Sequence, residues 1–257
     1  MLELKNIYKT YNPNTVREHE LFKDFSLKID NGSFVSVVGS NGSGKTSLLN
    51  ILCGSIGIDK GQIYMDGKDI TNTKEFVRNK RIGRIYQNPA LGSCSNLTVL
   101  ENMCLFDAKS NRMGLAPYIR KNRIEYYKDL LAPLNLGLEN MLNTVCGSLS
   151  GGQRQALAIA MATMTKIDFL ILDEHTAALD PNTSDTIMSL TEKIVKERQL
   201  TAIMVTHNLR YAVDYGDRLI MMHSGGIVFD AQGEKKQKLQ TEDLLGLFNQ
   251  ISIECGN

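Results

Sequence analysis

The sequence has no apolar run that approaches the roughly 20 residues needed for a membrane-spanning helix. Its apolar runs are strand-sized, such as residues 169–172 and 219–222. The first residues also lack a basic segment followed by an apolar one, which is the pattern of a secretion signal. We therefore expect a soluble protein with no membrane span or secretion signal of its own.

The sequence also lacks an excess of charge of either sign. It contains 29 Lys and Arg against 28 Asp and Glu, which gives a formal net charge of +1. Such a balance provides no bulk electrostatic attraction to nucleic acid or to anionic lipid. A local basic group, Arg120, Lys121 and Arg123, has two interpretations: the solvated face of a helix or a binding patch.

Cysteines at the spacing of a metal site are missing as well. The five cysteines are scattered along the chain and include no C-x-x-C pair. Their odd number and wide spacing favour reduced thiols in a cytoplasmic protein over a metal site. They are Cys53, Cys94, Cys104, Cys146 and Cys255.

The apolar pattern predicts one large α/β domain, because 257 residues cannot hold two complete nucleotide-binding domains. Apolar residues at 2–7 and 21–29, on either side of a polar insertion, predict an antiparallel β lobe. Residues 61–70 add two short strands joined by an Asp-Gly turn. From residue 90 to 148 the spacing becomes helical, which indicates a helical subdomain inserted into the core.

A glycine-rich stretch at 39–46 lies between the apolar run 34–38 and a helix-like segment, and it fits the phosphate-binding P-loop pattern. Backbone N–H groups at such a helix N-terminus attract phosphate, Lys45 reaches the β- and γ-phosphates, and the Thr46 hydroxyl holds Mg²⁺. The alternative is a flexible Gly/Ser loop. The residues expected around the phosphates are Gly39, Ser40, Asn41, Gly42, Ser43, Gly44, Lys45, Thr46 and Ser47.

Polar residues follow three further strand-like runs. Gln87 ends the run 82–86, and its amide either bridges Mg²⁺ and a water or only terminates the strand. Asp173 and Glu174 end the run 169–172, where an aspartate suits Mg²⁺ and a glutamate can accept a proton from water. His207 follows the run 202–206, where an imidazole is either structural or donates to a γ-phosphate oxygen.

Three more positions have both a binding and a structural interpretation. Ser150 with Gly151, Gly152 and Gln153 begins a helix, where the segment binds an anion or Ser150 acts only as an N-cap. Tyr11 follows the first strand and either stacks on an adenine ring or packs, with Tyr8 as the competing residue. Asp180 lies in a turn before a helix that begins at about residue 182.

Together these segments resemble the ATP-binding cassette (ABC) ATPases, over about residues 2–230. A P-loop alone is only moderately specific, whereas all these motifs in one order leave little room for chance. In this sequence they are the P-loop at 39–46, the Q-loop at Gln87, the LSGGQ signature at 149–153, Walker B at 169–173 with Glu174, the D-loop around Asp180 and the H-loop at His207.

The resemblance implies an α/β fold: a P-loop NTPase core with an antiparallel β lobe and an inserted α-helical subdomain. We expect a single ABC ATPase domain over residues 1–257, with 1–87 and 155–232 as core and β lobe, and 88–154 as helical signature subdomain. Residues 233–257 are expected to form a short C-terminal extension with a helix at about 242–248 and no regulatory domain.

The resemblance also implies a head-to-tail homodimer with two ATP molecules, each between the P-loop of one subunit and the signature of the other. ATP and Mg²⁺ are then the cofactors. Lys45, Gln87, Glu174 and His207 are implied as catalytic residues, with Glu174 polarising the attacking water. The implied metal ligands are Thr46, Gln87 and Asp173, and the implied nucleotide contacts are Tyr11, residues 39–47, Ser150 to Gln153 and Asp180.

The amino-acid sequence at residues 173–181 and 218–223 is similar to that of one subgroup, the ATPase subunits of bacterial uptake systems. These work with a separate membrane permease and an extracellular substrate-binding lipoprotein, and some are associated with aromatic amino acids. The implied location is the cytoplasmic face of the cell membrane, with no nucleic acid as partner. An export or mechanotransmission ATPase, or a soluble ABC protein acting on nucleic acid or ribosomes, remains the alternative.

One position departs from the family pattern. Most relatives have proline after the catalytic glutamate, whereas this chain has His175. The histidine either tunes the pH response of the site or is a tolerated loop substitution.

Overall fold

The structure is a computed structural model that describes residues 1–108 and 121–254. It divides into two compact units. The first unit combines Met1–Asn79 with Gln199–Asn257, and the second is Lys80–Arg198. Of the residues discussed from the sequence, Arg120 and Cys255 lie outside the described part of the chain.

The first unit contains an antiparallel sheet in the order β2-β1-β4-β5. Buried apolar side chains alternate along its two long strands, which gives the sheet one core-facing side. Asp66 and Gly67 both have positive φ, at 50° and 76°, as a tight hairpin turn between β4 and β5 requires. The expected antiparallel β lobe is therefore confirmed. Its strands are β1 (Leu2–Tyr11), β2 (His19–Ile29), β4 (Lys60–Met65) and β5 (Lys68–Asp69).

The other strands of the first unit follow the order β10-β9-β3-β8. All six residues of β3 are buried, as expected for a central strand covered on both faces. It pairs in parallel with β8 and with β9, and β10 pairs antiparallel to β9. The bounds are β3 (Phe34–Gly39), β8 (Thr201–Val205), β9 (Arg218–His223) and β10 (Gly226–Gln232), with helices α1 (Lys45–Cys53) and α7 (Leu209–Asp214) after β3 and β8.

A buried arginine joins α1 to α2 (Glu75–Arg78) in the first unit. The Arg78 guanidinium donates to the carbonyls of Ile51 at 2.8 Å and Leu52 at 3.2 Å, the last turn of α1. It also donates to three carbonyls of the segment before α2, those of Ile70, Thr71 and Thr73. Arg78 therefore adds donors to carbonyls at the end of α1, where helix acceptors lack their usual partners.

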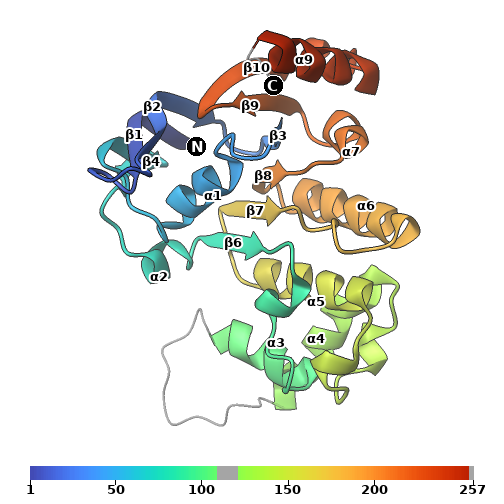
Figure 1. The fold of residues 1–257 in the computed structure, drawn as a ribbon. Helices are drawn as coiled ribbons and strands as arrows, with labels where there is room; N and C mark the ends of the chain where they lie inside the picture. Colours follow the sequence, from blue (N-terminus) through green and yellow to red (C-terminus); the bar gives the residue numbers. More distant parts are fainter. Residues whose placement is uncertain (109–120, 255–257) are drawn as a thin grey trace. The chain divides into compact units, whose positions relative to one another are not determined.

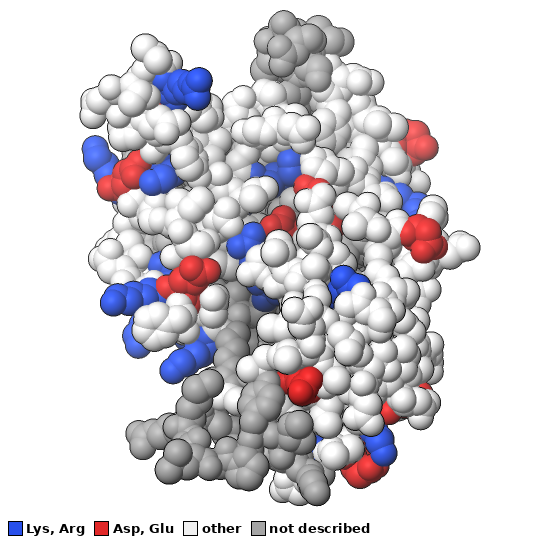
Figure 2. Space-filling view, turned by 60° about the horizontal axis from the view of Figure 1, so that its bottom comes forward, with Lys and Arg blue, Asp and Glu red and all other residues white. Residues whose placement is uncertain are grey.

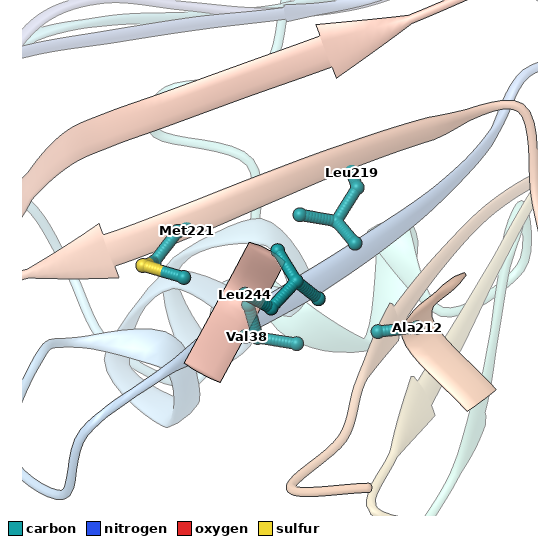
Figure 3. Close-up of a cluster of buried hydrophobic side chains, with 5 residues drawn as sticks. All are labelled: Val38, Ala212, Leu219, Met221 and Leu244. Atoms are coloured by element: carbon teal, nitrogen blue, oxygen red, sulfur yellow. The ribbon is translucent and has the colours of Figure 1, made fainter. Parts of the chain in front are cut away.

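The C-terminal extension forms α8 (Glu234–Gln237) and α9 (Thr241–Glu254), so its main helix is longer than the predicted 242–248. Leu244 of α9 is fully buried in a cluster with Val38, Ala212, Leu219 and Met221 (Figure 3). Val38 directly precedes the glycine-rich loop. Long-range packing, which a local pattern does not contain, therefore makes the extension part of the core of the first unit.

The second unit pairs β6 (Ile82–Ile85) in parallel with β7 (Phe169–Asp173). Between them the described residues form helices, which confirms the predicted helical insertion (Figure 1). The α-helices of the unit are α3 (Val99–Ala108), α4 (Ile124–Leu131), α5 (Gly151–Met164) and α6 (Pro181–Glu197). Its short 3₁₀ helices are η1 (Pro89–Gly92), η2 (Lys121–Arg123), η3 (Ala132–Leu134), η4 (Leu138–Asn140) and η5 (Cys146–Ser148).

Arg123 of the basic group is engaged within the helical insertion. Its guanidinium makes two hydrogen bonds to the Asp107 carboxylate, both 2.9 Å long, and lies 4.0 Å from the centre of the Tyr126 ring. Tyr127 donates its hydroxyl to the same carboxylate at 2.9 Å. Arg123 is therefore neither a simply solvated residue nor an open binding residue, but joins α3 to α4.

Charges of both signs occur on the surface face drawn in Figure 2, and in places acidic and basic side chains lie next to one another. This agrees with the net charge of +1. Within the described residues, no helix combines the length and apolar character needed to span a membrane.

Replacing Leu244 by alanine is expected to lower the free energy of unfolding by about 2–4 kcal/mol, because the truncation leaves a cavity in a packed cluster. The neighbouring Leu245 is 48% exposed, so Leu245→Ala provides a matched control with an expected loss below about 1 kcal/mol. Urea unfolding followed by circular dichroism measures both. Equal losses would show that α9 is not packed as described.

Arg78→Met is expected to lower the free energy of unfolding by about 2–4 kcal/mol, since it removes the guanidinium hydrogen bonds to five carbonyls and keeps a similar apolar volume. The exposed Arg17 serves as control, with Arg17→Met expected within about 0.5 kcal/mol of the parent. Urea midpoints compare the two, and an Arg78→Met protein as stable as its control would contradict the role of these bonds.

Candidate functional site

The glycine-rich loop leads from the central strand β3 directly into helix α1. Gly44 has φ 101° and stands at the N-cap of α1, a backbone conformation that favours glycine. A Cβ added there would lie 3.0 Å from the Phe22 ring, so the position is also crowded. The loop thus leads into the N-terminus of α1, where the first N–H groups of a helix have no acceptor within the helix, and this is the geometry of an anion-binding site.

Lys45 lies within this loop and is only 5% exposed. Its ammonium donates to the carbonyls of Gly39 at 2.7 Å and Ser40 at 2.9 Å. These bonds hold a positive charge over the loop rather than out in solvent. An ammonium in this place can neutralise a phosphate bound at the helix N-terminus.

Tyr11 ends strand β1 beside the start of α1. Its hydroxyl forms a 3.0 Å hydrogen bond with the Ser47 hydroxyl, one residue beyond Thr46. The competing residue Tyr8 instead has its ring 5.8 Å from the Lys60 ammonium. The hydrogen bond therefore places Tyr11 next to the loop, whereas its stacking on adenine stays a prediction.

His207 leaves the same edge of the first unit as the loop. Strand β8 runs parallel to β3, with Val205 opposite Val37, and parallel strands have their carboxyl ends at one edge. His207 is exposed, and Asn208 after it caps α7 by accepting from the Tyr211 N–H at 3.3 Å. The imidazole therefore lies at the edge of the sheet where the glycine-rich loop also ends.

In the second unit, Gln87 lies two residues beyond β6 and Asp173 is the last residue of β7. The two strands are parallel neighbours, with Ile85 opposite Leu172. Gln87 is exposed, and Asp173 and Glu174 are half-buried. Glu174 has φ 48°, a left-handed conformation that residues other than glycine adopt rarely. The carboxyl edge of this strand pair therefore carries an amide and two carboxylates, as the sequence predicts.

Arg84 is a residue of this site that the sequence analysis missed. Its guanidinium forms a 2.7 Å ion pair with the Asp173 carboxylate, and both side chains are nearly buried. The guanidinium also lies 4.8 Å from the centre of the Tyr86 ring. The sequence signal for Arg84 is a charged residue within the apolar run 82–86, but its partner follows only from the pairing of β6 with β7.

The signature segment begins helix α5 with a capping box. The Ser150 hydroxyl accepts from the Gln153 N–H at 3.2 Å, and the Gln153 side chain accepts from the Ser150 N–H at 3.1 Å. The structural interpretation of Ser150 as an N-cap is thus confirmed. Binding of an anion by this segment stays a prediction.

The signature glycines pack against the segment that begins α6. A Cβ on Gly151 would lie 3.0 Å from Leu179, and one on Gly152 would lie 2.4 Å from Thr183. Asp180 caps α6 by accepting from the Thr183 N–H at 3.1 Å. Hydrogen bonds from the side chain and from the backbone N–H of Thr183 lower the pKa of the Asp180 carboxyl group. The structure therefore brings the signature and Asp180 together within the second unit.

The comparisons with known proteins agree with this geometry. A sequence model described as ABC transporter matches residues 22–177. The chain is 43% identical to a tyrosine transport ATP-binding protein of Clostridioides difficile (strain R20291), covering 96% of this chain and 98% of the relative. It is 32% identical to the phosphonates import ATP-binding protein PhnC 2 of Oceanobacillus iheyensis, covering 96% of each.

Among solved structures, the chain is similar to the dimeric post-hydrolysis state of the ATP-binding cassette MJ0796 bound to ADP and Pi. The TM-score is 0.76 at 31% identity, covering 90% of this chain and 98% of that one. Since fold, motif order and relatives agree, the chain belongs to the ABC transporter family as one of its ATP-binding ATPase cassettes.

Proposed function

We propose that this chain is the ATP-hydrolysing subunit that powers uptake of a small solute through a separate membrane permease. The observation that carries the proposal is the similarity, over nearly the whole chain, to ATP-binding subunits named for tyrosine transport and for phosphonate import. An aromatic amino acid is the first solute class to test. An extracellular substrate-binding protein and a place at the cytoplasmic face of the membrane are part of the same proposal.

For nucleotide binding, we infer that the P-loop residues 39–47 surround the phosphates and that Tyr11 stacks on adenine. The position of Lys45 over the loop carbonyls and the hydrogen bond between Tyr11 and Ser47 support both roles. Replacement of the loop carbonyls by phosphate oxygens gives the Lys45 ammonium an ionised partner, and such hydrogen bonds are about twice as strong as neutral ones.

The proposed magnesium ligands are Thr46, Gln87 and Asp173. Mg²⁺ is usually bound by one or two carboxylates together with substrate phosphates and water rather than by an all-protein cage. A single carboxylate, a hydroxyl and an amide fit that pattern. Bound Mg²⁺ would neutralise charge on the β- and γ-phosphates.

For hydrolysis, we infer that Glu174 accepts a proton from the attacking water and that His207 and Gln87 orient the reacting groups. Lys45 stabilises charge on the γ-phosphate. Phosphoryl transfer requires little covalent chemistry from the protein, so positioning and charge stabilisation supply most of the catalysis. Arg84 supports this arrangement by holding the Asp173 carboxylate in place.

We further propose a homodimer in which Ser150, Gly151, Gly152 and Gln153 of one subunit, with Asp180 nearby, complete the nucleotide site of the other. The packing of the signature glycines against residues 179–183 supports a joint role. The division into core and β lobe (1–87 and 155–232), helical signature subdomain (88–154) and C-terminal extension (233–257) belongs to the same proposal.

Glu174→Gln is expected to reduce ATP hydrolysis by about 100-fold or more, because a general base contributes at least that factor, while ATP still binds. Lys45→Ala is the contrasting variant and is expected to weaken ATP binding itself by about tenfold or more, or about 1.4 kcal/mol. Phosphate release and binding of a fluorescent ATP analogue measure the two effects. Hydrolysis at the parent rate in Glu174→Gln would remove Glu174 from the base role.

The transport function is tested by affinity purification of the Glu174→Gln protein from detergent-solubilised native membranes with ATP and Mg²⁺. We expect a multispanning membrane protein to co-purify. Together with its substrate-binding protein, the pair is expected to drive ATP-dependent tyrosine uptake in proteoliposomes once the parent Glu174 is restored. A Lys45→Ala sample is the control for nucleotide-dependent capture. Recovery of only ribosomal or DNA-associated proteins would overturn the proposal.

A further inference from the structure

His175 lies directly after the proposed catalytic Glu174 but points away from solvent, with only 2% of its surface exposed. The backbone between the two side chains turns sharply, because Glu174 has φ 48° and its carbonyl accepts from the Ala177 N–H at 2.9 Å. A left-handed conformation costs a residue other than glycine about 1–3 kcal/mol and persists only where surrounding contacts hold it. The contacts of the neighbouring His175 therefore bear on how the turn at Glu174 is held.

The His175 ring forms a hydrogen bond with helix α6. Its Nε2 lies 3.3 Å from the hydroxyl oxygen of Thr191, which is fully buried. The Thr191 hydroxyl donates its one proton to the Ile187 carbonyl at 2.7 Å. Since a hydroxyl has a single proton, the oxygen must accept from His175, and this assigns the proton of the neutral imidazole to Nε2.

Two more contacts join the same segment to α6. The Ser184 hydroxyl donates to the Thr176 carbonyl at 3.2 Å, and Asp180 accepts from the Thr183 N–H at 3.1 Å. Ser184 and Thr191 are seven residues apart and therefore lie on one face of the helix. The turn that carries Glu174 is thus hydrogen-bonded to α6 at several points, and the bond made by His175 is the one next to the Glu174 carboxylate.

Only 2% of His175 is exposed, so the bond from its Nε2 to the Thr191 hydroxyl is shielded from competing water. A buried donor such as the His175 ring, with the Thr191 hydroxyl as its fixed acceptor, is suited to holding the backbone of the turn in place.

We propose that His175 is a positioning residue for ATP hydrolysis, whose hydrogen bond to Thr191 holds the left-handed turn and thereby directs the Glu174 carboxylate to the attacking water. This inference rests on the proposed role of Glu174. It assigns to His175 and Thr191 a function in turnover that neither the tolerated-substitution interpretation nor simple core packing would give them.

The decisive comparison is Thr191→Val with Thr191→Ser. Valine keeps the branched shape but removes the acceptor, so kcat is expected to fall about tenfold while binding of a non-hydrolysable ATP analogue stays within twofold. Serine keeps the hydroxyl and is expected to retain kcat within about twofold. Thr186→Val is the matched control, because Thr186 is exposed on the same helix and makes the same kind of bond, to the Asn182 carbonyl at 3.0 Å.

The paired histidine variants provide a second route if Thr191→Val does not fold. His175→Gln keeps an N–H donor and is expected to retain more of kcat than His175→Leu. Combining His175→Leu with Thr191→Val is expected to lower kcat no further than either change alone, since both remove one bond. The proposal would be overturned if kcat is unchanged in Thr191→Val and His175→Leu. It would also be overturned if their losses of kcat add in the double variant, or if analogue binding falls as much as kcat.

Glu174→Gln separates this inference from the function on which it rests. If Glu174→Gln abolishes hydrolysis and the Thr191 and His175 variants turn over ATP like the parent, only the positioning role fails. If Glu174→Gln hydrolyses ATP at the parent rate, the base role fails and the positioning role fails with it.

Discussion

Parallel pairing of short, buried strands is the constraint on which the candidate site depends. In the first unit it brings the carboxyl ends of β3 and β8 to one edge, so the glycine-rich loop and His207 emerge together. In the second it does the same for β6 and β7, and Gln87 emerges beside Asp173 and Glu174. Residues far apart in sequence become neighbours because the strands before them share hydrogen bonds.

Much of the fold and site could be predicted because the signals are local. A glycine-rich loop between strand and helix, acids at the end of an apolar strand, and Ser150 three residues before Gln153 each carry their structural meaning within a few residues. The antiparallel lobe and the helical insertion follow from apolar periodicity in the same way. Such patterns specify an element and its end without knowledge of the rest of the chain.

What could not be predicted depends on contacts across many residues. The ion pair between Arg84 and Asp173, the burial of Leu244 against β3 and β9, and the bond from His175 to Thr191 join segments that no spacing rule connects. Two of these contacts also define the role of a residue: Arg84 holds the Asp173 carboxylate, and His175 is a buried hydrogen-bond donor. Sequence alone identifies the groups that do chemistry better than those that hold them.

The arginine between α1 and α2 has a further consequence for the conditions under which the first unit keeps its shape. The Arg78 guanidinium is held by carbonyl oxygens, which do not titrate, whereas a carboxylate partner would lose its charge in acid. Dissolved ions also screen a buried bond of this kind far less than an exposed ion pair. The hydrogen bonds from Arg78 therefore hold the C-terminal end of α1 in place independently of pH and ionic strength.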